Sequence, residues 1–408
     1  MQSTVDSRAS LAYRKVVMQP LKSGFRWYGE NDEVPLSFIV QSGATGVFTS
    51  LHHIPYGEVW SIDEIQKRLD ILAKYNLTWD AVESVPVSED IKLRTGDYKT
   101  HIENYKETIR NLAKCGVKNI IYNFMPVLDW IRTDLHYTLP DGSQCLRFDP
   151  VQFAAFEIYL LKREGAEKNY TQQQLELAKE FFDSLNEESR KKFERGLIDV
   201  FPGCKMGLEI GDVRKMLAKY DGIDAKKLKE HLRLFLEEVL PVAEECGSIM
   251  AIHPDDPPFD VLGLPRIASR LADFQEMFEV CPSKANTICF CTGSLSAGKH
   301  NNIIELLDAL RDRIYIAHLR STQIEADGSF YEAGHLEGGV PMREVVKKLL
   351  LLQDERLAAG GDKIVFRPDH GRDMADDLLK PPTANPGYSF IGRMKGLAEL
   401  RGLQHAML

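Results

Sequence analysis

Short apolar runs alternate with amphipathic stretches along most of the chain. Eight runs have the length and β-branched character of strands, and they cover residues 25–29, 46–53, 78–86, 119–127, 248–258, 286–294, 313–322 and 363–372. Helices are expected at 35–43, 61–76, 101–115, 301–310, 341–357 and 388–401. The second of these opens on Ser61, a favourable N-cap, and carries Ile65, Leu69 and Leu72 on one face. Eight repeated βα units predict an α/β protein, a (β/α)8 TIM barrel.

One gap between strands is too long for a single connection. Residues 128–247 contain four runs with helical character, at 148–163, 171–201, 210–220 and 224–246. The last of them suits the barrel's own helix, which leaves a helical insertion at about 155–225. Because the insertion follows the carboxyl end of the fourth strand, where TIM-barrel active sites lie, a cap over the site is expected. A solubilising or dimerising appendage is the alternative. Residues 1–24 read as a polar extension, and 25–408 as one catalytic barrel domain.

Composition and charge narrow the class of protein. The 408 residues are 44% hydrophobic and 27% charged, which is typical of a globular enzyme, and the net charge of −9 argues against nucleic acid as a partner. No apolar run approaches the ~18 residues of a membrane span. The N-terminal segment lacks the apolar core of a secretory signal. Seven scattered cysteines indicate reduced thiols and a cytoplasmic location.

Each of four consecutive predicted strands ends in a side chain that can bind a metal ion. These side chains are His253, Cys291, His318 and Asp369. The carboxyl ends of parallel barrel strands converge on one cavity, so the four side chains are expected to be neighbours. A lone histidine at a strand end is more often structural, but four such positions in consecutive βα units favour a site. Two imidazoles, a thiolate and a carboxylate can hold zinc, iron or manganese.

The pattern leaves two questions about this site open. Cys289 shares the inward face with Cys291 and competes for the ligand role, although Cys291 lies closer to the strand end and Cys289 suits the core. A closed tetrahedral set would be structural, whereas an open position would allow Lewis-acid chemistry. The polar residues crowded nearby favour the second alternative.

Further polar residues at strand ends indicate which kind of ligand the cavity binds. Arg320 and Arg367 are candidates for bidentate binding of a carboxylate. His52, Glu83 and Asn123 are expected around the same cavity. Together they predict a polyhydroxylated ligand that carries an acid group. No glycine-rich nucleotide motif follows any strand.

Ordered motifs from about Phe25 to Leu403 resemble the mannonate dehydratase family. The motifs include RWYG, TSLHHIP, VESVP, YNFMPVLDW, HPDDPP, CTGS, HLRST, RPDHGR and NPGYS. The resemblance implies a xylose-isomerase-like barrel and one divalent ion, Mn²⁺ or Fe²⁺. It also implies dehydration of D-mannonate to 2-dehydro-3-deoxy-D-gluconate in hexuronate (glucuronate) catabolism. The implied metal ligands are His253, Cys291, His318 and Asp369, and the implied catalytic residues are His370 and Tyr388.

Several alternatives remain at the level of sequence. Either His370 or Tyr388 is able to take the C2 proton, with the other protonating the C3 oxygen. His370 is alternatively a partner that orients Asp369, and Tyr388 a packing residue at the barrel rim. The rival enzyme is a metal-dependent sugar isomerase or sugar-acid epimerase, and a non-enzymatic sugar-acid binding protein is a third reading. A homodimer is the default expectation.

Overall fold

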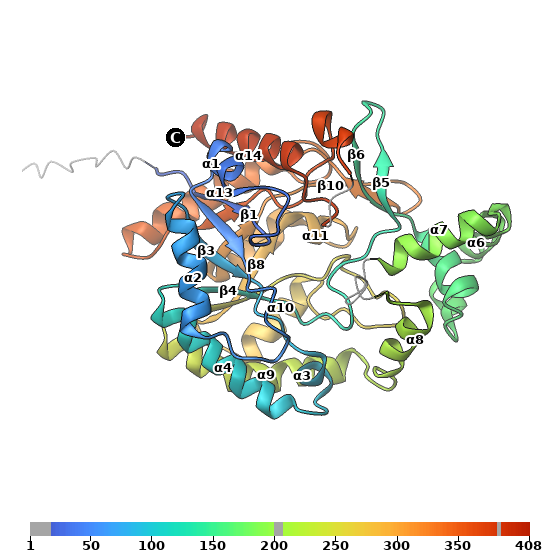
Figure 1. Ribbon diagram of the computed structural model, residues 1–408, viewed down its shortest axis with the longest axis horizontal. Helices are drawn as coiled ribbons and strands as arrows, with labels where there is room; N and C mark the ends of the chain where they lie inside the picture. Colours follow the sequence, from blue (N-terminus) through green and yellow to red (C-terminus); the bar gives the residue numbers. More distant parts are fainter. Residues whose placement is uncertain (1–17, 200–206, 382–384) are drawn as a thin grey trace, which may run out of the picture.

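The eight predicted strands form a closed parallel barrel. A computed structural model describes residues 18–199, 207–381 and 385–408, and the barrel order in it is β1-β12-β9-β8-β7-β4-β3-β2 (Figure 1). Its strands are β1 (Lys22–Arg26), β2 (Gly46–Thr49), β3 (Thr78–Glu83), β4 (Asn119–Tyr122), β7 (Ile249–Ile252), β8 (Asn286–Cys291), β9 (Ile314–His318) and β12 (Val365–Arg367). Each overlaps one predicted run, so the TIM-barrel prediction is confirmed.

A ring of helices covers the outside of the barrel. They are α1 (Leu36–Gln41), α2 (Ile62–Ala73), α4 (Tyr98–Lys114), α9 (Ala225–Glu245), α10 (Leu271–Val280), α12 (Ile303–Leu310), α13 (Met342–Ala358) and α14 (Phe390–His405). The Ser61 side chain caps α2 by accepting a hydrogen bond from the Glu64 N–H at 3.3 Å, and Ile65 and Leu72 are buried, as predicted. Helix α10 was not predicted. Shorter helices are α3 (Glu89–Leu93), α11 (Thr292–Ser296), η4 (Arg311–Arg313) and η5 (Ala375–Leu379).

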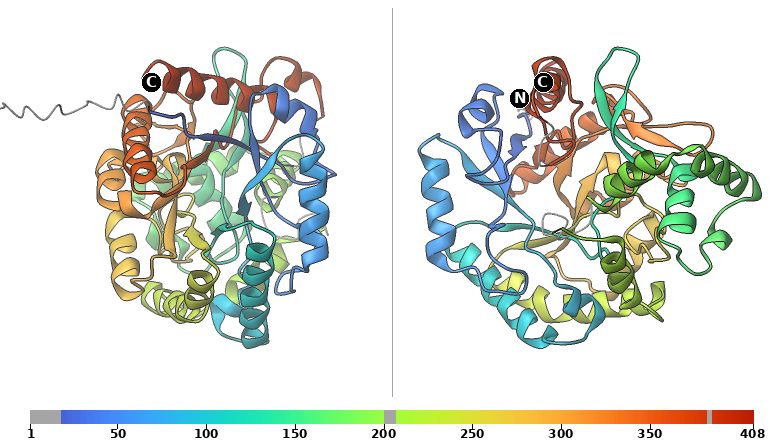
Figure 2. Two further views of the ribbon diagram at one scale, coloured as in Figure 1. Left: turned by 90° about the vertical axis from the view of Figure 1, so that its left-hand side faces the viewer. Right: turned by 45° about the vertical axis from the view of Figure 1, so that its right-hand side comes forward.

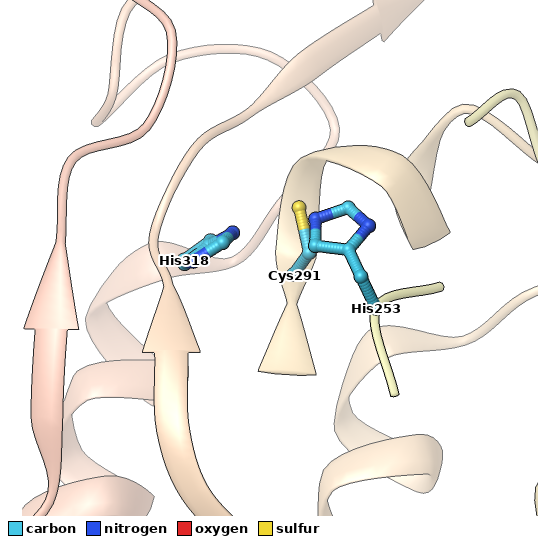
Figure 3. A group of neighbouring side chains, drawn as sticks. All are labelled: His253, Cys291 and His318. Atoms are coloured by element: carbon cyan, nitrogen blue, oxygen red, sulfur yellow. The ribbon is translucent and has the colours of Figure 1, made fainter. Parts of the chain in front are cut away.

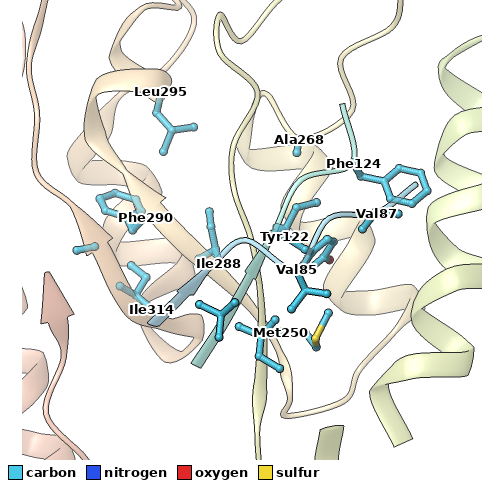
Figure 4. Close-up of a cluster of buried hydrophobic side chains, with 14 of the residues drawn as sticks. Val85, Val87, Tyr122, Phe124, Met250, Ala268, Ile288, Phe290, Leu295 and Ile314 are labelled. Carbon is cyan, nitrogen blue, oxygen red and sulfur yellow. The ribbon is translucent and has the colours of Figure 1, made fainter. Parts of the chain in front are cut away.

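The main core lies between the strands and these helices. Outward-facing strand side chains such as Tyr122, Met250, Ile288 and Phe290 are buried there (Figure 4). Because successive residues of a strand point to opposite faces, their neighbours in the chain point into the barrel. The strands are therefore buried on both faces, which explains why they read as continuous apolar runs.

The segment between β4 and α9 contains more than the predicted helices. A hairpin of β5 (Asp134–Thr138) and β6 (Gln144–Phe148) comes first. It joins β10 (Thr322–Ile324) and β11 (Phe330–Glu332) in a second, antiparallel sheet of order β10-β11-β6-β5. This sheet was not predicted, because its two hairpins are separated by residues 149–321 and each is too short to give a periodic signal alone.

The helical part of the insertion is α5 (Pro150–Ala155), η1 (Phe156–Leu160), η2 (Ala166–Asn169), α6 (Gln172–Ser184), α7 (Glu187–Ile198) and α8 (Ile210–Ala218). The predicted run at 171–201 is split, because Asn186 starts a new helix by accepting from the Ser189 N–H at 2.9 Å. Its last two residues, and residues 1–17 of the predicted extension, lie outside the described ranges. Helices α6 to α8 lie at one side of the barrel, where α7 packs beside β5 and α8 lies farther from the β5–β6 hairpin (Figure 1 and Figure 2). Within the described ranges no helix is long and apolar enough to cross a bilayer.

Candidate active site

The inside of the barrel carries a layer of buried apolar side chains. We call this the apolar layer, and its members are Phe48, Ala81, Ile121, Ala251, Cys289, Ile316 and Val365. Strand β1 contributes Gly24 at the same level, where a Cβ would collide with the Phe48 ring. The prediction that Cys289 packs in the core is confirmed, and burial raises its pKa well above the ordinary value for a thiol.

Two residues further along every strand, the inward side chain is polar. This polar layer consists of Arg26, Ser50, Glu83, Asn123, His253, Cys291, His318 and Arg367. A step of two residues keeps the same face of a strand, so all eight follow the apolar layer into the carboxyl-terminal mouth of the barrel. Six of them border a cavity of about 280 Å³, while Cys291 and His318 are buried beside it.

Three members of the polar layer form a candidate metal centre. One ligand atom from each of His253, Cys291 and His318 lies within 4.8 Å of the other two. Figure 3 shows these side chains reaching toward one another from three neighbouring strand ends. Nδ1 of His253 lies 2.7 Å from the Pro254 carbonyl oxygen, which can only accept, so Nδ1 carries a hydrogen and Nε2 is the candidate ligand atom. Such an outer hydrogen bond is typical of a metal-binding histidine.

Asp369 lies next to this triad without being part of it. Its Oδ2 is 3.5 Å from the Cys291 Sγ. The carboxylate instead forms ion pairs with two guanidiniums. Its Oδ1 lies 2.6 Å from Arg367 Nη1, and its Oδ2 lies 2.9 Å from Arg320 Nε. Burial raises the pKa of Asp369, but Arg367 and Arg320 outweigh it and hold that pKa well below its usual range. The carboxylate is therefore charged, and its role as a fourth ligand stays a prediction.

The two arginines expected to bind a substrate carboxylate are occupied by carboxylates of the protein. Besides Asp369, Arg320 holds Asp256 at 2.5 Å and Glu332 at 2.6 Å. Arg367 Nε lies 2.8 Å from Glu83, and its Nη2 contacts the same carboxylate. Every nitrogen of both guanidiniums thus lies near a protein acceptor, although Arg320 Nε only forms an ion pair and makes no hydrogen bond in the described ranges. These ion pairs fix the cavity floor. Both arginines also border the cavity, and their binding of a substrate carboxylate stays a prediction.

The two candidate catalytic residues, His370 and Tyr388, both border the cavity. Their rings meet edge to face, with centroids 4.9 Å apart. The Tyr388 hydroxyl donates to Asp369 Oδ1 at 3.2 Å. Burial, reinforced by the neighbouring Tyr28, raises the pKa of Tyr388 well above its usual value, so the phenol keeps its proton.

The three remaining predicted residues also border the cavity. The His52 ring is exposed at the mouth, yet desolvation and the nearby Arg26 lower its pKa, so it stays neutral. Burial raises the pKa of Glu83, but Arg367 and His318 leave that pKa well below the usual value. The Asn123 amide makes no hydrogen bond to any other residue in the described ranges, which leaves it available to a ligand.

Sequence reasoning missed several residues of the site. Arg26 ends β1 and Tyr28 follows it, both in the RWYG motif, and the same strand-end rule could have found them. Tyr28 stacks on His52 with centroids 5.6 Å apart. Asp256 and Glu332 are buried carboxylates that hold Arg320. Glu332 comes from the second sheet, so no feature of the barrel repeat pointed to it.

Comparisons with known proteins agree with this geometry. The family model described as D-mannonate dehydratase (UxuA) matches residues 21–408. The chain belongs to the D-mannonate dehydratase family. A mannonate dehydratase of Marinomonas sp. (strain MWYL1) is 48% identical over 93% of this chain and 97% of the relative. That of Saccharophagus degradans is 44% identical over 95% and 98%. The crystal structure of mannonate dehydratase from Streptococcus suis serotype2 matches with a TM-score of 0.72 and 31% identity, over 95% of this chain and 93% of that one. The resemblance drawn from the sequence motifs is confirmed.

Proposed function

We propose that this protein removes water from D-mannonate to give 2-dehydro-3-deoxy-D-gluconate. The observation that carries the proposal is the triad of His253, Cys291 and His318 on the floor of a polar cavity that His370 and Tyr388 border. Family membership over residues 21–408 supports the same reaction and does not favour the rival sugar isomerase or epimerase.

The residues present fit a divalent ion. His253, Cys291 and His318 offer two nitrogens and a sulfur within 4.8 Å of one another, and Asp369 offers an ionised oxygen beside the sulfur. Nitrogen, thiolate and carboxylate ligands suit first-row transition metals. We propose Mn²⁺ or Fe²⁺, one ion per chain. When bound, such an ion supplies Lewis-acid stabilisation for the negative charge that develops beside the substrate carboxylate.

The chain's own residues handle the two protons of the reaction. The C2 hydrogen leaves as a proton, and the C3 hydroxyl leaves as water after gaining one; the resulting enol then becomes the 2-keto acid by moving its hydroxyl proton to C3. Tyr388 and His370 both border the cavity, with ring centroids 4.9 Å apart. One of them takes the C2 proton and the other protonates the departing hydroxyl.

Three residues on the cavity wall are proposed to bind the sugar hydroxyls. The Asn123 amide offers two donors and an acceptor. Neutral His52 offers one donor, the Nδ1 hydrogen, because its Nε2 accepts from Arg26 Nη2 at 3.1 Å. Tyr28 adds an aromatic face against which the carbon chain can pack. Glu83 acts indirectly, since its carboxylate holds Arg367 in place.

The surroundings of the reaction follow from the family and composition. We propose a cytoplasmic homodimer that binds a small sugar acid and no nucleic acid. We also propose that residues 25–408 are one catalytic domain and that the helical segment at about 155–225 acts as a cap. Among the described residues of that segment none borders the cavity, so capping would require a movement of the segment.

The test is turnover by purified protein. Metal-stripped protein is supplied with Mn²⁺, Fe²⁺ or Zn²⁺ and incubated with D-mannonate, and the 2-keto-3-deoxy acid is measured. We expect product with Mn²⁺ or Fe²⁺ and none with the stripped protein. Aldoses serve as the control substrates. Interconversion of aldoses without any turnover of D-mannonate would instead support the isomerase reading.

A further inference from the structure

Glu332 reaches the candidate catalytic site from outside the barrel. It is the last residue of β11, in the antiparallel sheet, and its side chain is buried. Its Oε1 lies 3.1 Å from Nδ1 of His370. Nε2 of the same ring makes no hydrogen bond to any residue in the described part of the chain, and the ring borders the cavity. Glu332 therefore contacts the nitrogen that faces the protein, and Nε2 remains for the substrate.

A second group competes for the same ring nitrogen. Nη1 of Arg320 lies 2.7 Å from His370 Nδ1. A ring nitrogen either carries a hydrogen and donates or holds a lone pair and accepts. Nδ1 can thus donate to Glu332 or accept from Arg320, but it cannot do both. The two neighbours favour opposite tautomers of a neutral ring.

Only one of these states is useful at Nε2. To take a proton there, the ring must be neutral with its hydrogen on Nδ1. To give a proton from Nε2, it must be an imidazolium, which also has a hydrogen on Nδ1. A neutral ring that accepts from Arg320 carries its hydrogen on Nε2 and can act neither as base nor as acid. Whichever role His370 has, Nδ1 must be protonated.

We propose that Glu332 is a positioning residue that keeps a hydrogen on Nδ1 of His370 against the competing donor Arg320. This inference rests on the proposed function, because it gives His370 a part in the reaction. Glu332 also accepts a hydrogen from the competing donor, since the same Arg320 Nη1 donates to Glu332 Oε1 at 2.6 Å. The Glu332 carboxylate thus accepts hydrogen bonds both from the His370 ring and from Arg320, the donor that competes for it.

The second sheet holds this carboxylate in place. Strand β11 pairs with β6 on one side and β10 on the other. The fully buried Arg132 donates to Glu332 Oε1 at 2.9 Å and lies over the Phe330 ring at 4.7 Å. The other oxygen, Oε2, is buried without a partner in the described ranges, so all the donors converge on Oε1. The hairpin inserted after β4 therefore has a task in the site, which is to support the strand that carries Glu332.

The test compares Glu332→Gln, Glu332→Asp and a matched control, Asp80→Asn. Asp80 is also a buried carboxylate, but it does not border the cavity and pairs with Lys22, the first residue of β1, at 2.6 Å. With D-mannonate as substrate, Glu332→Gln is expected to lower kcat about 100-fold with KM changed by less than about threefold. Metal content should equal that of the wild type. Glu332→Asp keeps the charge and should recover about tenfold of the loss, while Asp80→Asn keeps wild-type kcat.

A second measurement is independent of turnover. Imidazole ¹⁵N spectra of the metal-free protein, with His370 assigned by its absence from His370→Asn, report which ring nitrogen carries hydrogen. We expect a protonated Nδ1 in the wild type and a bare Nδ1 in Glu332→Gln. A bare Nδ1 in the wild type, or a kcat for Glu332→Gln within about threefold of the wild type, would overturn the proposal. If Glu332→Gln does not fold, the wild-type spectrum decides. A wild type inactive on D-mannonate would defeat the proposed function alone, because the spectra still test the tautomer.

Discussion

The inner faces of the same barrel strands carry two layers with opposite chemistry. In the apolar layer, residues such as Ile121, Cys289 and Ile316 pack together without a polar partner. Two positions later, Asn123, Cys291 and His318 belong to the polar layer. Burial of the first layer stabilises the fold through the hydrophobic effect. Burial of the second costs free energy unless its groups are paired or bind a ligand. On each strand, the residue that stabilises the fold and the residue that belongs to the site are thus only two positions apart.

The sharpest contrast lies within β9, where His318 and Ile316 point the same way. His318→Ala is expected to lose the metal and to lower kcat by about 10³-fold or more, because the ion loses a ligand. Ile316→Ala should keep one ion per chain and lose about 2–5 kcal/mol of unfolding free energy, because it leaves a cavity in the apolar layer. Elemental analysis, steady-state kinetics and urea unfolding measure the three quantities. Equal metal loss in both variants would erase the distinction between the layers.

Substitution of His370 distinguishes binding of the metal ion from the chemical step. His370→Asn is expected to lower kcat about 10²–10⁴-fold, because the proton-transferring group is lost, while metal content stays at the wild-type level. Asn is of similar size and keeps hydrogen-bonding capacity toward Glu332. Metal analysis of the protein used for kinetics is the control. Full activity in this variant would remove His370 from the mechanism.

The two cysteines of β8 give a matched pair. Cys291→Ser is expected to bind metal about 10–100-fold more weakly, because a hydroxyl replaces the thiolate ligand. Cys289→Ser should bind it normally and lose about 1–3 kcal/mol of stability, because it buries a hydroxyl among apolar side chains. Metal titration and chemical unfolding of both proteins distinguish these outcomes. If metal binding were weaker in Cys289→Ser and normal in Cys291→Ser, Cys289 would be the metal ligand and Cys291 the core residue.

Acid should affect the paired carboxylates at the cavity and leave the apolar layer unchanged. Burial raises the pKa of Asp256, but Arg132 and Arg320 outweigh it and leave that pKa below its usual value. The unfolded chain then binds the proton more readily, so this contribution to stability is present above about pH 4 and is lost as pH falls further.

In metal-free protein, Asp256→Asn should therefore flatten the fall in unfolding free energy below pH 4, by up to about 1.4 kcal/mol per pH unit. Ile316→Ala should shift the whole curve downward without changing its slope. Urea unfolding between pH 3 and pH 6 provides the comparison. An unchanged slope for Asp256→Asn would mean that this carboxylate is not held in its charged form.

Much of this arrangement could be predicted from the sequence. The eight strands were recognisable as apolar runs, and period two placed His253, Cys291 and His318 on the inward face. What the sequence could not indicate is how side chains pair across the site. Arg367 meets Glu83 across 284 residues, and Arg320 meets Asp256 across 64. Neither pair leaves a local signal, so the carboxylates that surround both candidate arginines could not be predicted.

The second sheet eluded prediction for a related reason. Strands β10 and β11 have three residues each, and the sheet needs β5 and β6 from a distant part of the chain to complete it. Short strands without a full partner are indistinguishable from loops in sequence. The place of Glu332 in the site depends on this sheet and therefore could not be predicted from the barrel repeat.

The most direct test of the metal centre is anomalous X-ray diffraction from crystals of the protein grown with Mn²⁺. We expect one anomalous peak at about 2.0–2.4 Å from the ligand atoms of His253, Cys291 and His318, with the Asp369 carboxylate turned toward it. A peak at another place in the molecule, or an empty polar layer in crystals of the active enzyme, would contradict the account.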